Sequence, residues 1–451
     1  MRYALPLTVA TFVVGFLFNF YFPLYTDEAY YWLWSKHLDV GYLDHPPVTA
    51  FVIWIATLVG DYGWSIKFAA LACYALSAYF VFLLAKKAYT KDIGIIAALI
   101  FSLSPAVTAG MSIMTPDAPL VLFWTMSLYY AYKVLFERSK ASDFAILGIL
   151  IGLAMASKYT AALLVIFIVL YVAVKKWRML LDKKSWLVPL LSFAVFAPVI
   201  WWNYANNWIG FEFQLSRAIL KLNPLQGFGE FFGGLFIIFS PVFTGFLIYG
   251  IFKWRSYDEK TKFFATITYG VLGFFIYKSF FGHMELNWVA PAFISGSILV
   301  ALHIVPYRRF LISGVIIAVI LGLVIRFPFL FGLQGAANPH QRVFGYAEAA
   351  QRVKELKSAD DAVMSDHLTN ASILWFYIGT PVTIPTDSRM SAFDFWGLGA
   401  KAPLKKGIYM SRSDESEALK RIYSDVLLVE KFEAKKNGFK NVEFYIYKVV
   451  P

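Results

Sequence analysis

Long apolar stretches alternate with short polar loops over the first three quarters of the chain. About eleven of these stretches reach or approach the ~20 residues that a helix needs to cross ~30 Å of hydrocarbon. The first has one basic residue before it and no small-residue cleavage site after it, so we expect a retained helix rather than a signal peptide. The predicted transmembrane helices are 3–22, 66–85, 93–109, 118–136, 143–157, 159–174, 186–205, 231–252, 263–280, 288–305 and 311–331.

The stretch 143–174 is long enough to be a single helix, but we predict two. Counted as one helix, it would place every later basic loop on the outer side of the membrane, and two short helices that meet at Ser157-Lys158-Tyr159 keep those loops inside. Two such short helices put the turn at membrane depth, where irregular backbone is tolerated only against protein or a water-filled cavity. A lysine at that depth is a candidate site residue.

The pattern changes after Phe331, where polar and apolar residues become mixed. Helical spacing appears at 346–356, and 413–423 is typical of an amphipathic helix. Short strands are expected at 362–366, 382–385, 407–410, 426–429 and 444–449. We therefore predict a polytopic α-helical membrane module at 1–335, followed by a small α/β domain at 339–451.

Composition and charge support the membrane class. The chain is 59% hydrophobic and 16% charged, whereas a soluble domain has about 25% charged residues. With a cytoplasmic N-terminus, lysines and arginines favour the inside loops over the outside loops by about three to one, as the positive-inside rule requires. This distribution accounts for the net charge of +12 without a nucleic-acid partner, and the odd number of helices places 339–451 outside. The single cysteine, Cys73, lies in an apolar stretch and is expected to be a packing residue.

Candidate chemistry gathers in the outer loops, predicted at 23–65, 110–117, 206–230 and 281–287. The first begins with the adjacent carboxylates Asp27-Glu28, continues through aromatic residues and ends in Asp44-His45-Pro46-Pro47. A glycosyl transfer needs a base for the acceptor proton and groups that hold the leaving phosphate. The alternative for these residues is a solvated loop with an aromatic belt.

The other outer-face residues also allow two interpretations each. Asp117 is either a site acid or a favourable charge at a helix N-terminus. Lys158 binds a lipid phosphate, or it snorkels or forms a structural ion pair. Arg217 either binds a phosphate through two hydrogen bonds or contacts lipid headgroups. His283 and Glu285 ligate a metal or are solvated beside a membrane-belt tryptophan.

In this order and topology the motifs resemble the GT-C superfamily of integral-membrane glycosyltransferases. The likeness is to the branch with protein O-mannosyltransferases, the lipid A aminoarabinose transferase and lipopolysaccharide galacturonosyltransferases. It covers essentially the whole chain and is strongest near 20–220. The motifs that carry it are Asp27-Glu28, Leu43-Asp44-His45-Pro46-Pro47, Thr115-Pro116-Asp117, Ser157-Lys158-Tyr159 and Asn287-Trp288.

The resemblance implies an enzyme of the bacterial inner membrane that works at the periplasmic face by an inverting mechanism. Its donor would be a sugar on a polyprenyl phosphate. Its acceptor would be a hydroxyl or phosphate of lipid A, lipopolysaccharide, another glycolipid or a protein. No cofactor is required by the resemblance, although a divalent metal is possible.

The resemblance also implies roles for individual residues. Asp27 matches the acid proposed as general base or acceptor orienter, with Glu28 beside it. His45 stands where the aminoarabinose enzyme has a lysine, and Asp44 where that enzyme has a glutamate that is a possible metal ligand. The implied donor-binding residues are Lys158, Asp117, His45, Arg217, Tyr30 and Tyr159, and the candidate metal ligands are Asp44, His283 and Glu285.

Two other classes of function account for only part of the sequence. A transporter or flippase fits the many helices and the intramembrane Lys158, but the sequence has no inverted repeat, and its ionisable residues gather at one face. A membrane-anchored binding protein led by 339–451 leaves the acids of the first loop unexplained. A nucleotide-sugar donor is disfavoured because no Gly-rich phosphate loop is present.

Overall fold

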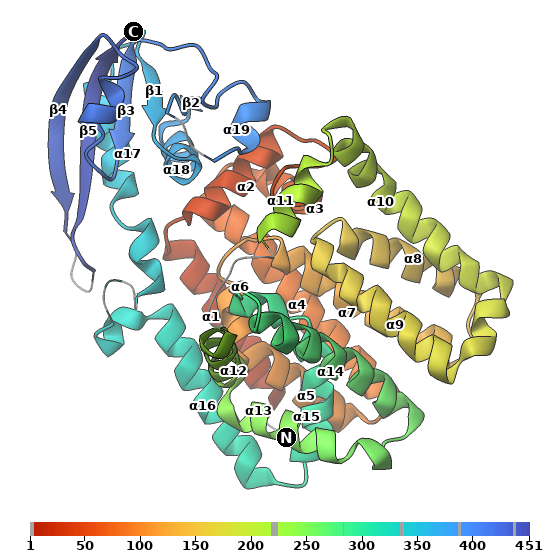
Figure 1. The fold of residues 1–451 in the computed structure, drawn as a ribbon. Coiled ribbons are helices and arrows are strands. Elements are labelled where there is room, and N and C mark those ends of the chain that lie inside the picture. Colours follow the sequence, from red (N-terminus) through yellow and green to blue (C-terminus); the bar gives the residue numbers. More distant parts are fainter. Residues whose placement is uncertain are drawn as a thin grey trace. The chain divides into compact units, whose positions relative to one another are not determined.

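The computed structural model describes residues 4–217, 224–282, 284–333, 335, 338–386, 389–435 and 439–451, without the side chains of Arg217 and Pro339. Its chain divides into two compact units (Figure 1). The helical unit comprises Met1–Tyr21 and Asp39–Arg326. The C-terminal unit comprises Phe327–Pro451 together with Phe22–Leu38, a segment of the predicted first outer loop.

Each predicted transmembrane stretch corresponds to one helix or to a pair of helices. Two further helices, α3 (Val48–Ala56) and α11 (Ile209–Arg217), lie in predicted outer loops. The others of the helical unit are α1 (Ala4–Tyr21), α4 (Gly63–Ala88), α5 (Lys91–Leu103), α6 (Pro105–Gly110), α7 (Asp117–Phe136), α8 (Ala141–Met155), α9 (Ala162–Lys175), α10 (Leu187–Ala205), α12 (Pro224–Phe239), α13 (Pro241–Phe252), α14 (Glu259–Ser279), α15 (Ala292–Ile304) and α16 (Arg308–Arg326).

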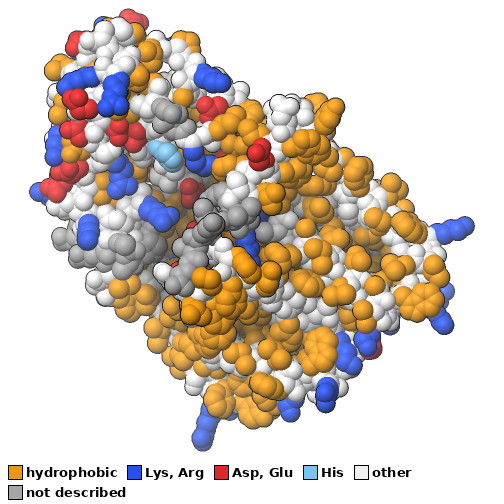
Figure 2. Space-filling model, viewed as in Figure 1, with side chains coloured by type: hydrophobic (Ala, Val, Ile, Leu, Met, Phe, Trp, Pro, Cys, Tyr) orange, Lys and Arg blue, Asp and Glu red, His pale blue; other side chains and the backbone are white. Residues whose placement is uncertain are grey.

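The count of about eleven transmembrane helices stays a prediction. Among the described residues, four helices are long and apolar enough to cross a membrane, or five if the bent pair α12–α13 forms one span. Several shorter apolar helices accompany them. On the face seen in Figure 2, hydrophobic side chains cover most of the helical unit, as lipid contact requires.

Two stretches predicted as continuous helices are interrupted by proline. The stretch 93–109 divides between α5 and α6 at Pro105, and 231–252 divides between α12 and α13 at Pro241, where the axis bends by 111°. Proline lacks the N–H that continues a helix and is favoured in the first turn of a new one. Ser240 at the second break adopts a left-handed φ of 77°.

The predicted break in 143–174 is confirmed. Helix α8 ends at Met155, a 3-10 turn covers Tyr159–Ala161, and α9 begins at Ala162. Helices α8 and α9 contain 15 and 14 residues, so each is shorter than the ~20 residues of a full span. Lys158 therefore lies in a turn between two short apolar helices.

Helices α8 and α10 approach closely because α8 presents two glycines, Gly148 and Gly152, one turn apart. A Cβ atom on Gly152 would lie 2.6 Å from the Cβ of Val195, and one on Gly148 would lie 2.8 Å from the carbonyl of Val188. The hydroxyl of Ser192 donates to the Gly148 carbonyl at 2.9 Å. Small residues with this spacing let membrane helices pack backbone against backbone.

We predict that Gly152→Val destabilises the helical unit by about 1–3 kcal/mol, the usual result of overpacking a tight contact. Gly245→Val is the matched control, because nothing lies within 4 Å of a Cβ at that glycine of α13. Thermal unfolding of the two purified variants in detergent measures the difference. Equal shifts of the midpoint would show that the α8–α10 contact tolerates a side chain at residue 152.

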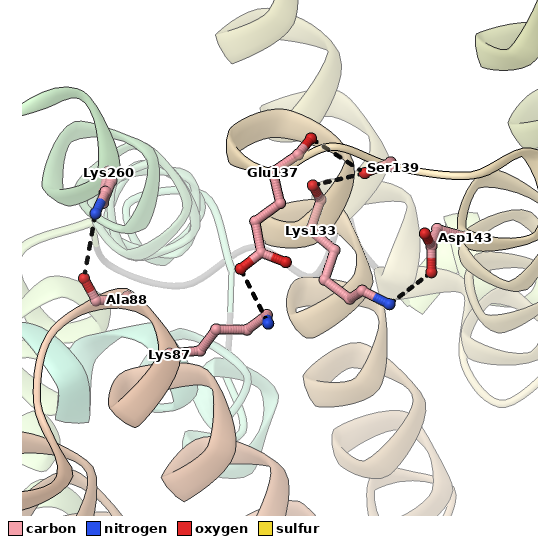
Figure 3. A network of polar contacts seen from close by, with 7 residues as sticks. All are labelled: Lys87, Ala88, Lys133, Glu137, Ser139, Asp143 and Lys260. Atoms are coloured by element: carbon pink, nitrogen blue, oxygen red, sulfur yellow. Dashed lines mark hydrogen bonds and ion pairs between the residues drawn. The ribbon is translucent and has the colours of Figure 1, made fainter.

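The ends of several helices meet in a charged network at one end of the helical unit (Figure 3). Lys87, in the last turn of α4, pairs with Glu137 after α7 at 2.9 Å, and Lys133 of α7 pairs with Asp143 of α8 at 2.6 Å. Lys260 of α14 donates to the carbonyl of Ala88 at 3.5 Å. Three of the five loops that charge counting assigns to the cytoplasmic side therefore lie together, as that assignment requires.

The C-terminal unit is built on a described five-stranded sheet in the order β2-β1-β3-β5-β4. β1 pairs in parallel with β2 and β3, whereas β5 is antiparallel to β3 and β4. All five predicted strands are confirmed. They are β1 (Ala362–Ser365), β2 (Val382–Thr383), β3 (Gly407–Ser411), β4 (Asp425–Ala434) and β5 (Val442–Val450).

The helices of this unit differ in part from the prediction. α17 (Tyr346–Leu356) is confirmed, but the helix expected at 413–423 is reduced to α20 (Ser416–Leu419). The Asp414 carboxylate accepts from the backbone N–H of Ser416 and from the Tyr447 hydroxyl, which ties the start of that segment to β5. The remaining helices are α2 (Thr26–Lys36), α18 (Leu368–Ile378) and α19 (Ala392–Phe395).

Candidate active site

The predicted outer loops of the helical unit meet around the turn that carries Lys158. The backbone N–H of Val48, at the start of α3, donates to the carbonyl of Ala156 at 3.1 Å. Val48 and Ala156 form a buried cluster with Phe196 and Val199 of α10, and Tyr159 packs against this cluster. The turn is thus covered by protein, as its expected depth in the membrane requires.

Lys158 forms a buried ion pair with Asp117. The Lys158 Nζ lies 2.7 Å from Asp117 Oδ1, and the two side chains are 8% and 6% exposed. The second oxygen, Oδ2, accepts from Asn287 Nδ2 at 2.7 Å. Asp117 is the first residue of α7, so the helix dipole also favours its negative charge. Both structural alternatives considered for these residues, an ion pair and a helix-terminal charge, are therefore realised.

A second lysine belongs to this cluster. Lys278, near the end of α14, places its Nζ 4.7 Å from the ring centroid of Trp288, and the Nζ of Lys158 lies 5.9 Å from the same centroid. The indole face attracts both cations. Lys278 lies in the predicted transmembrane helix 263–280 and was given no role there, because its distance from Lys158 in the chain hid this arrangement.

The segment with Asp44 and His45 is held by α11. The Gln214 side-chain amide donates to the carbonyl of Asp44, and the backbone N–H of Phe211 donates to Asn203 Oδ1 at 3.1 Å. Asp44 is buried and His45 is half-buried. Arg217 is the last residue of α11, and its side chain lies outside the described part of the structure.

The helix that carries Asp27 and Glu28 belongs to the C-terminal unit. Asp27 is exposed in the first turn of α2. Glu28 is fully buried, and its Oε2 accepts from the backbone N–H of Tyr25 at 2.8 Å. This hydrogen bond pairs a backbone N–H at the start of α2 that has no partner within the helix. The two acids therefore differ: Glu28 caps the helix, and Asp27 faces solvent.

Tyr30 also has a structural place in this unit. It is 3% exposed, its hydroxyl accepts from the Ala392 backbone N–H at 2.9 Å, and its ring stacks on Phe393. The ring of Trp32 packs edge-on against Phe376 of α18. These contacts integrate α2 into the C-terminal unit, and a donor-binding role for Tyr30 stays a prediction.

The candidate metal ligands do not form a described site. Asp44 is buried in the helical unit, Glu285 is exposed before the 3-10 turn at Leu286–Val289, and His283 lies outside the described residues. Within the described ranges, no group of three or more His, Cys, Asp or Glu side chains could hold a metal ion.

Known proteins match this chain in sequence and in fold. The family model for dolichyl-phosphate-mannose-protein mannosyltransferases matches residues 44–202. The lipid A galacturonosyltransferase RgtD of Rhizobium johnstonii is 25% identical over 288 residues, which are 61% of this chain and 59% of that protein. The alignment therefore leaves more than a third of the relative unmatched.

Two solved structures extend the likeness to the whole fold. ArnT from Cupriavidus metallidurans, bound to undecaprenyl phosphate, has a TM-score of 0.71 at 12% identity, over 99% of this chain and 98% of its own. The chain has the GT-C fold. The archaeal oligosaccharyltransferase AglB from Archaeoglobus fulgidus, in complex with an inhibitory peptide and a dolichol-phosphate, has a TM-score of 0.56 at 10% identity, over 90% of this chain and 69% of its own.

The GT-C fold confirms the resemblance drawn from the motifs. The segment matched by the family model contains His45, Asp117 and Lys158, so it includes the buried ion pair, whereas Asn287 and Lys278 lie outside it. At 10–12% identity the solved structures establish the fold alone. The roles of individual residues have to come from the contacts in this chain.

We predict that Asp117→Asn destabilises the protein by about 3–5 kcal/mol, because it leaves the buried ammonium of Lys158 without its counter-charge. The Asp117→Asn, Lys158→Met double variant should recover part of this loss, since neither charge is then buried alone. Thermal unfolding in detergent provides the measurement.

Glu137→Gln is the control for this prediction, since it breaks a pair whose side chains are 30% and 34% exposed. Glu137→Gln should lower the free energy of unfolding by less than about 1 kcal/mol. If Asp117→Asn shifts the unfolding midpoint no more than Glu137→Gln does, the buried pair does not stabilise the fold.

Proposed function

We propose that the chain transfers a sugar from a polyprenyl-phosphate donor to an envelope acceptor by an inverting mechanism. The observation that carries the proposal is the buried cluster of Lys158, Asp117 and Asn287 in a chain with the GT-C fold. It lies at one end of α7, whose 20 residues span roughly 30 Å. The charged network of Lys87 and Glu137 lies at the other end.

This separation supports a proposed orientation. The network end carries the basic loops, which the positive-inside rule assigns to the cytoplasm. The Lys158 cluster then faces the periplasm, with the N-terminus cytoplasmic and 339–451 outside. The membrane is the bacterial inner membrane in this proposal, as for relatives that modify the envelope.

Lys158 is the proposed contact for the donor phosphate. A phosphate entering beside Lys158 also meets the charge of Lys278, whose Nζ lies over the same Trp288 ring. Before the donor arrives, Asp117 balances the ammonium of Lys158, which avoids a lone buried charge. Cations held in this way stabilise the charge that develops on the leaving phosphate. Arg217 and His45 remain proposed assisting residues, and Tyr159 lines the same turn.

An apolar cavity beside this cluster suits the polyprenyl tail. The cavity has a volume of about 500 Å³ and lies between α7, α8, α9 and α10. Its lining includes Phe196, a member of the buried apolar cluster around Ala156, and Met155 and Ile200, which pack against that cluster. A tail in this cavity therefore leaves its phosphate near the Lys158 turn. An isoprenoid chain requires apolar walls, and most of the lining residues are apolar.

Asp27 is the proposed base. In the proposed step, the acceptor oxygen attacks the anomeric carbon, the bond from that carbon to the phosphate oxygen breaks, and the acceptor proton passes to Asp27. The polyprenyl phosphate leaves with the bonding electron pair. The exposed carboxylate of Asp27 is accessible to an acceptor, whereas the buried Glu28 is already occupied as a cap.

We predict that Asp27→Asn lowers transfer from a polyprenyl-phosphate sugar at least about 100-fold, the usual contribution of a general base. The assay measures glycoside formation in membranes that contain the full chain. Asp92→Asn is the matched control, because Asp92 is likewise exposed and is the second residue of its helix, α5. Near-normal turnover of Asp27→Asn would remove Asp27 from the mechanism.

We predict that Lys158→Ala, combined with Asp117→Asn to avoid a lone buried carboxylate, raises the apparent KM for the donor more than about tenfold with a smaller change in kcat. Lys133→Ala, which breaks the pair at the other end of α7, should leave the KM unchanged. An unchanged donor KM in the double variant would contradict a phosphate role for Lys158.

The rival proposal, a transporter or flippase, makes a different prediction for the same protein. Purified chain in sealed vesicles would move the lipid-linked sugar across the bilayer without forming a glycosidic bond. Mass spectrometry of envelope glycolipids from cells with and without the protein identifies the acceptor and sugar if transfer is the function.

A further inference from the structure

A groove opens on the surface of the helical unit between α13 and the start of α16. It has a volume of about 470 Å³, and its walls are mainly apolar. Helix α13 contributes Gly245, Phe246 and Tyr249, and Tyr307 and Phe310 form the opposite wall. Tyr249, Tyr307 and Phe310 are exposed. The groove, here called the α13–α16 groove, is therefore open to the surroundings of the helices.

The groove results from a close helix contact followed by a missing side chain. A Cβ atom on Gly314 of α16 would lie 2.5 Å from Cε1 of Phe243 in α13, so the two helices touch there. Two residues further along α13, nothing lies within 4 Å of a Cβ built on Gly245. A larger side chain at residue 245 would thus occupy the groove without entering the contact between Phe243 and Gly314.

Basic side chains gather where α13 ends and α16 begins. The Nζ of Lys253 lies 5.3 Å from the ring centroid of Tyr249, which places one cation at the wall of the groove. In Figure 2, blue side chains stand along the lower edge of the helical unit, where Figure 1 shows these two helix ends. The exposed basic residues of these two ends are Lys253, Arg255, Arg308 and Arg309.

The two acids that follow α13 contact elements that do not line the groove. Asp258 Oδ1 accepts from the backbone N–H and the hydroxyl of Thr261 at 2.9 and 2.5 Å, which caps α14. Glu259 Oε2 accepts from the hydroxyl of Tyr171 in α9 at 3.3 Å. The end of the groove near Lys253 therefore combines a positive charge with apolar walls.

We propose that the α13–α16 groove binds an anionic phospholipid, with one acyl chain along the groove and the phosphate at Lys253, Arg308 and Arg309. Basic pockets between membrane helices bind anionic headgroups on the cytoplasmic side. An acyl chain requires apolar walls, and tyrosines such as Tyr249 and Tyr307 are favoured at the level of the headgroups. In the orientation proposed above, this lipid belongs to the cytoplasmic leaflet.

The charge at the groove favours a lipid over a second copy of the chain. A symmetric dimer through this surface would bring the same patch of both copies together. The basic side chains at the two helix ends would then face their own counterparts, and like charges in an interface are unfavourable. The cavity proposed for the polyprenyl tail lies among α7, α8, α9 and α10, none of which lines this groove. The inference is therefore independent of the proposed function.

The test measures lipid binding to the purified full chain in detergent by native mass spectrometry, which resolves states with different numbers of bound lipids. The probes are dioleoyl phosphatidylglycerol and, as the neutral comparison, dioleoyl phosphatidylcholine. Gly245→Phe fills the groove. Gly273→Phe is its matched control, because Gly273 of α14 is also exposed and has nothing within 4 Å of a Cβ.

A second pair of variants tests the headgroup. The variant with Lys253→Gln, Arg308→Gln and Arg309→Gln removes the proposed phosphate contacts. Its control carries the same change at three other exposed basic residues, which lie between α9 and α10 on the side that charge counting also assigns to the cytoplasm. These control residues are Arg178, Lys183 and Lys184.

We expect the dissociation constant for the first bound phosphatidylglycerol to be at least about tenfold lower than that for phosphatidylcholine, the gain expected from one charge-assisted hydrogen bond. The headgroup variant should remove most of this difference. Gly245→Phe should raise both dissociation constants at least about tenfold, because the acyl chain loses its space. Both controls should resemble the unaltered protein. The headgroup variant changes only exposed residues, so it tests the inference even if Gly245→Phe fails to fold.

Four results would overturn the inference. Phosphatidylcholine could bind as tightly as phosphatidylglycerol, or both experimental variants could bind the two lipids as their controls do. A dimer of the unaltered protein that separates in Gly245→Phe would show that a second copy occupies the groove. Undecaprenyl phosphate that binds more tightly than phosphatidylglycerol, with the same loss in Gly245→Phe, would assign the groove to an isoprenoid tail instead.

Discussion

The buried ion pair between Lys158 and Asp117 is the interaction on which the candidate donor site depends. Removing both charges from water costs several kcal/mol per ion, and only close pairing with further hydrogen bonds offsets that cost. The pair meets this condition at 2.7 Å, with Asn287 on the second carboxylate oxygen. The pair joins the turn after α8 to the start of α7, and the hydrogen bond from Asn287 adds the segment after α14, so the Asp117 carboxylate connects three distant segments.

The C-terminal unit has an equally direct effect on the proposed chemistry. Helix α2 is buried against α18 and α19 through Trp32 and Tyr30, and Glu28 is used to cap it. The position of Asp27 is therefore set by the packing of residues that follow it by more than 300 positions in the chain. A change in that packing would move the proposed base without touching the ion pair of the helical unit.

Much of the fold could be predicted from the sequence because hydrophobic periodicity is local. The apolar stretches, the break at Ser157-Lys158-Tyr159 and the five strands all follow from it. The errors arose where one residue or a distant contact decided the result. Pro241 bends a stretch that is apolar throughout, and Tyr447 binds Asp414 from another strand.

The candidate site was predictable only in part, for the same reason. Charge counting placed Asp117 and Lys158 at one face, and the structure pairs them. Counting could not show that Lys278 shares Trp288 with Lys158, or that the helix of Asp27 belongs to another unit. Helix α18 was also missed, because its residues are apolar on most sides and give no amphipathic signal.

The ion pair also constrains how a donor can bind in the proposed reaction. A phosphate that approaches Lys158 competes with Asp117 for the same ammonium. Its binding free energy is therefore less favourable than it would be at an unpaired lysine. The remaining affinity has to come from the apolar cavity between α7 and α10, where each buried methylene of the tail contributes about 0.8 kcal/mol. After transfer, Asp117 can take Lys158 back from the polyprenyl phosphate. The pair that stabilises the empty site would therefore also favour release of the product, and lipid-linked phosphates would be selected over soluble ones.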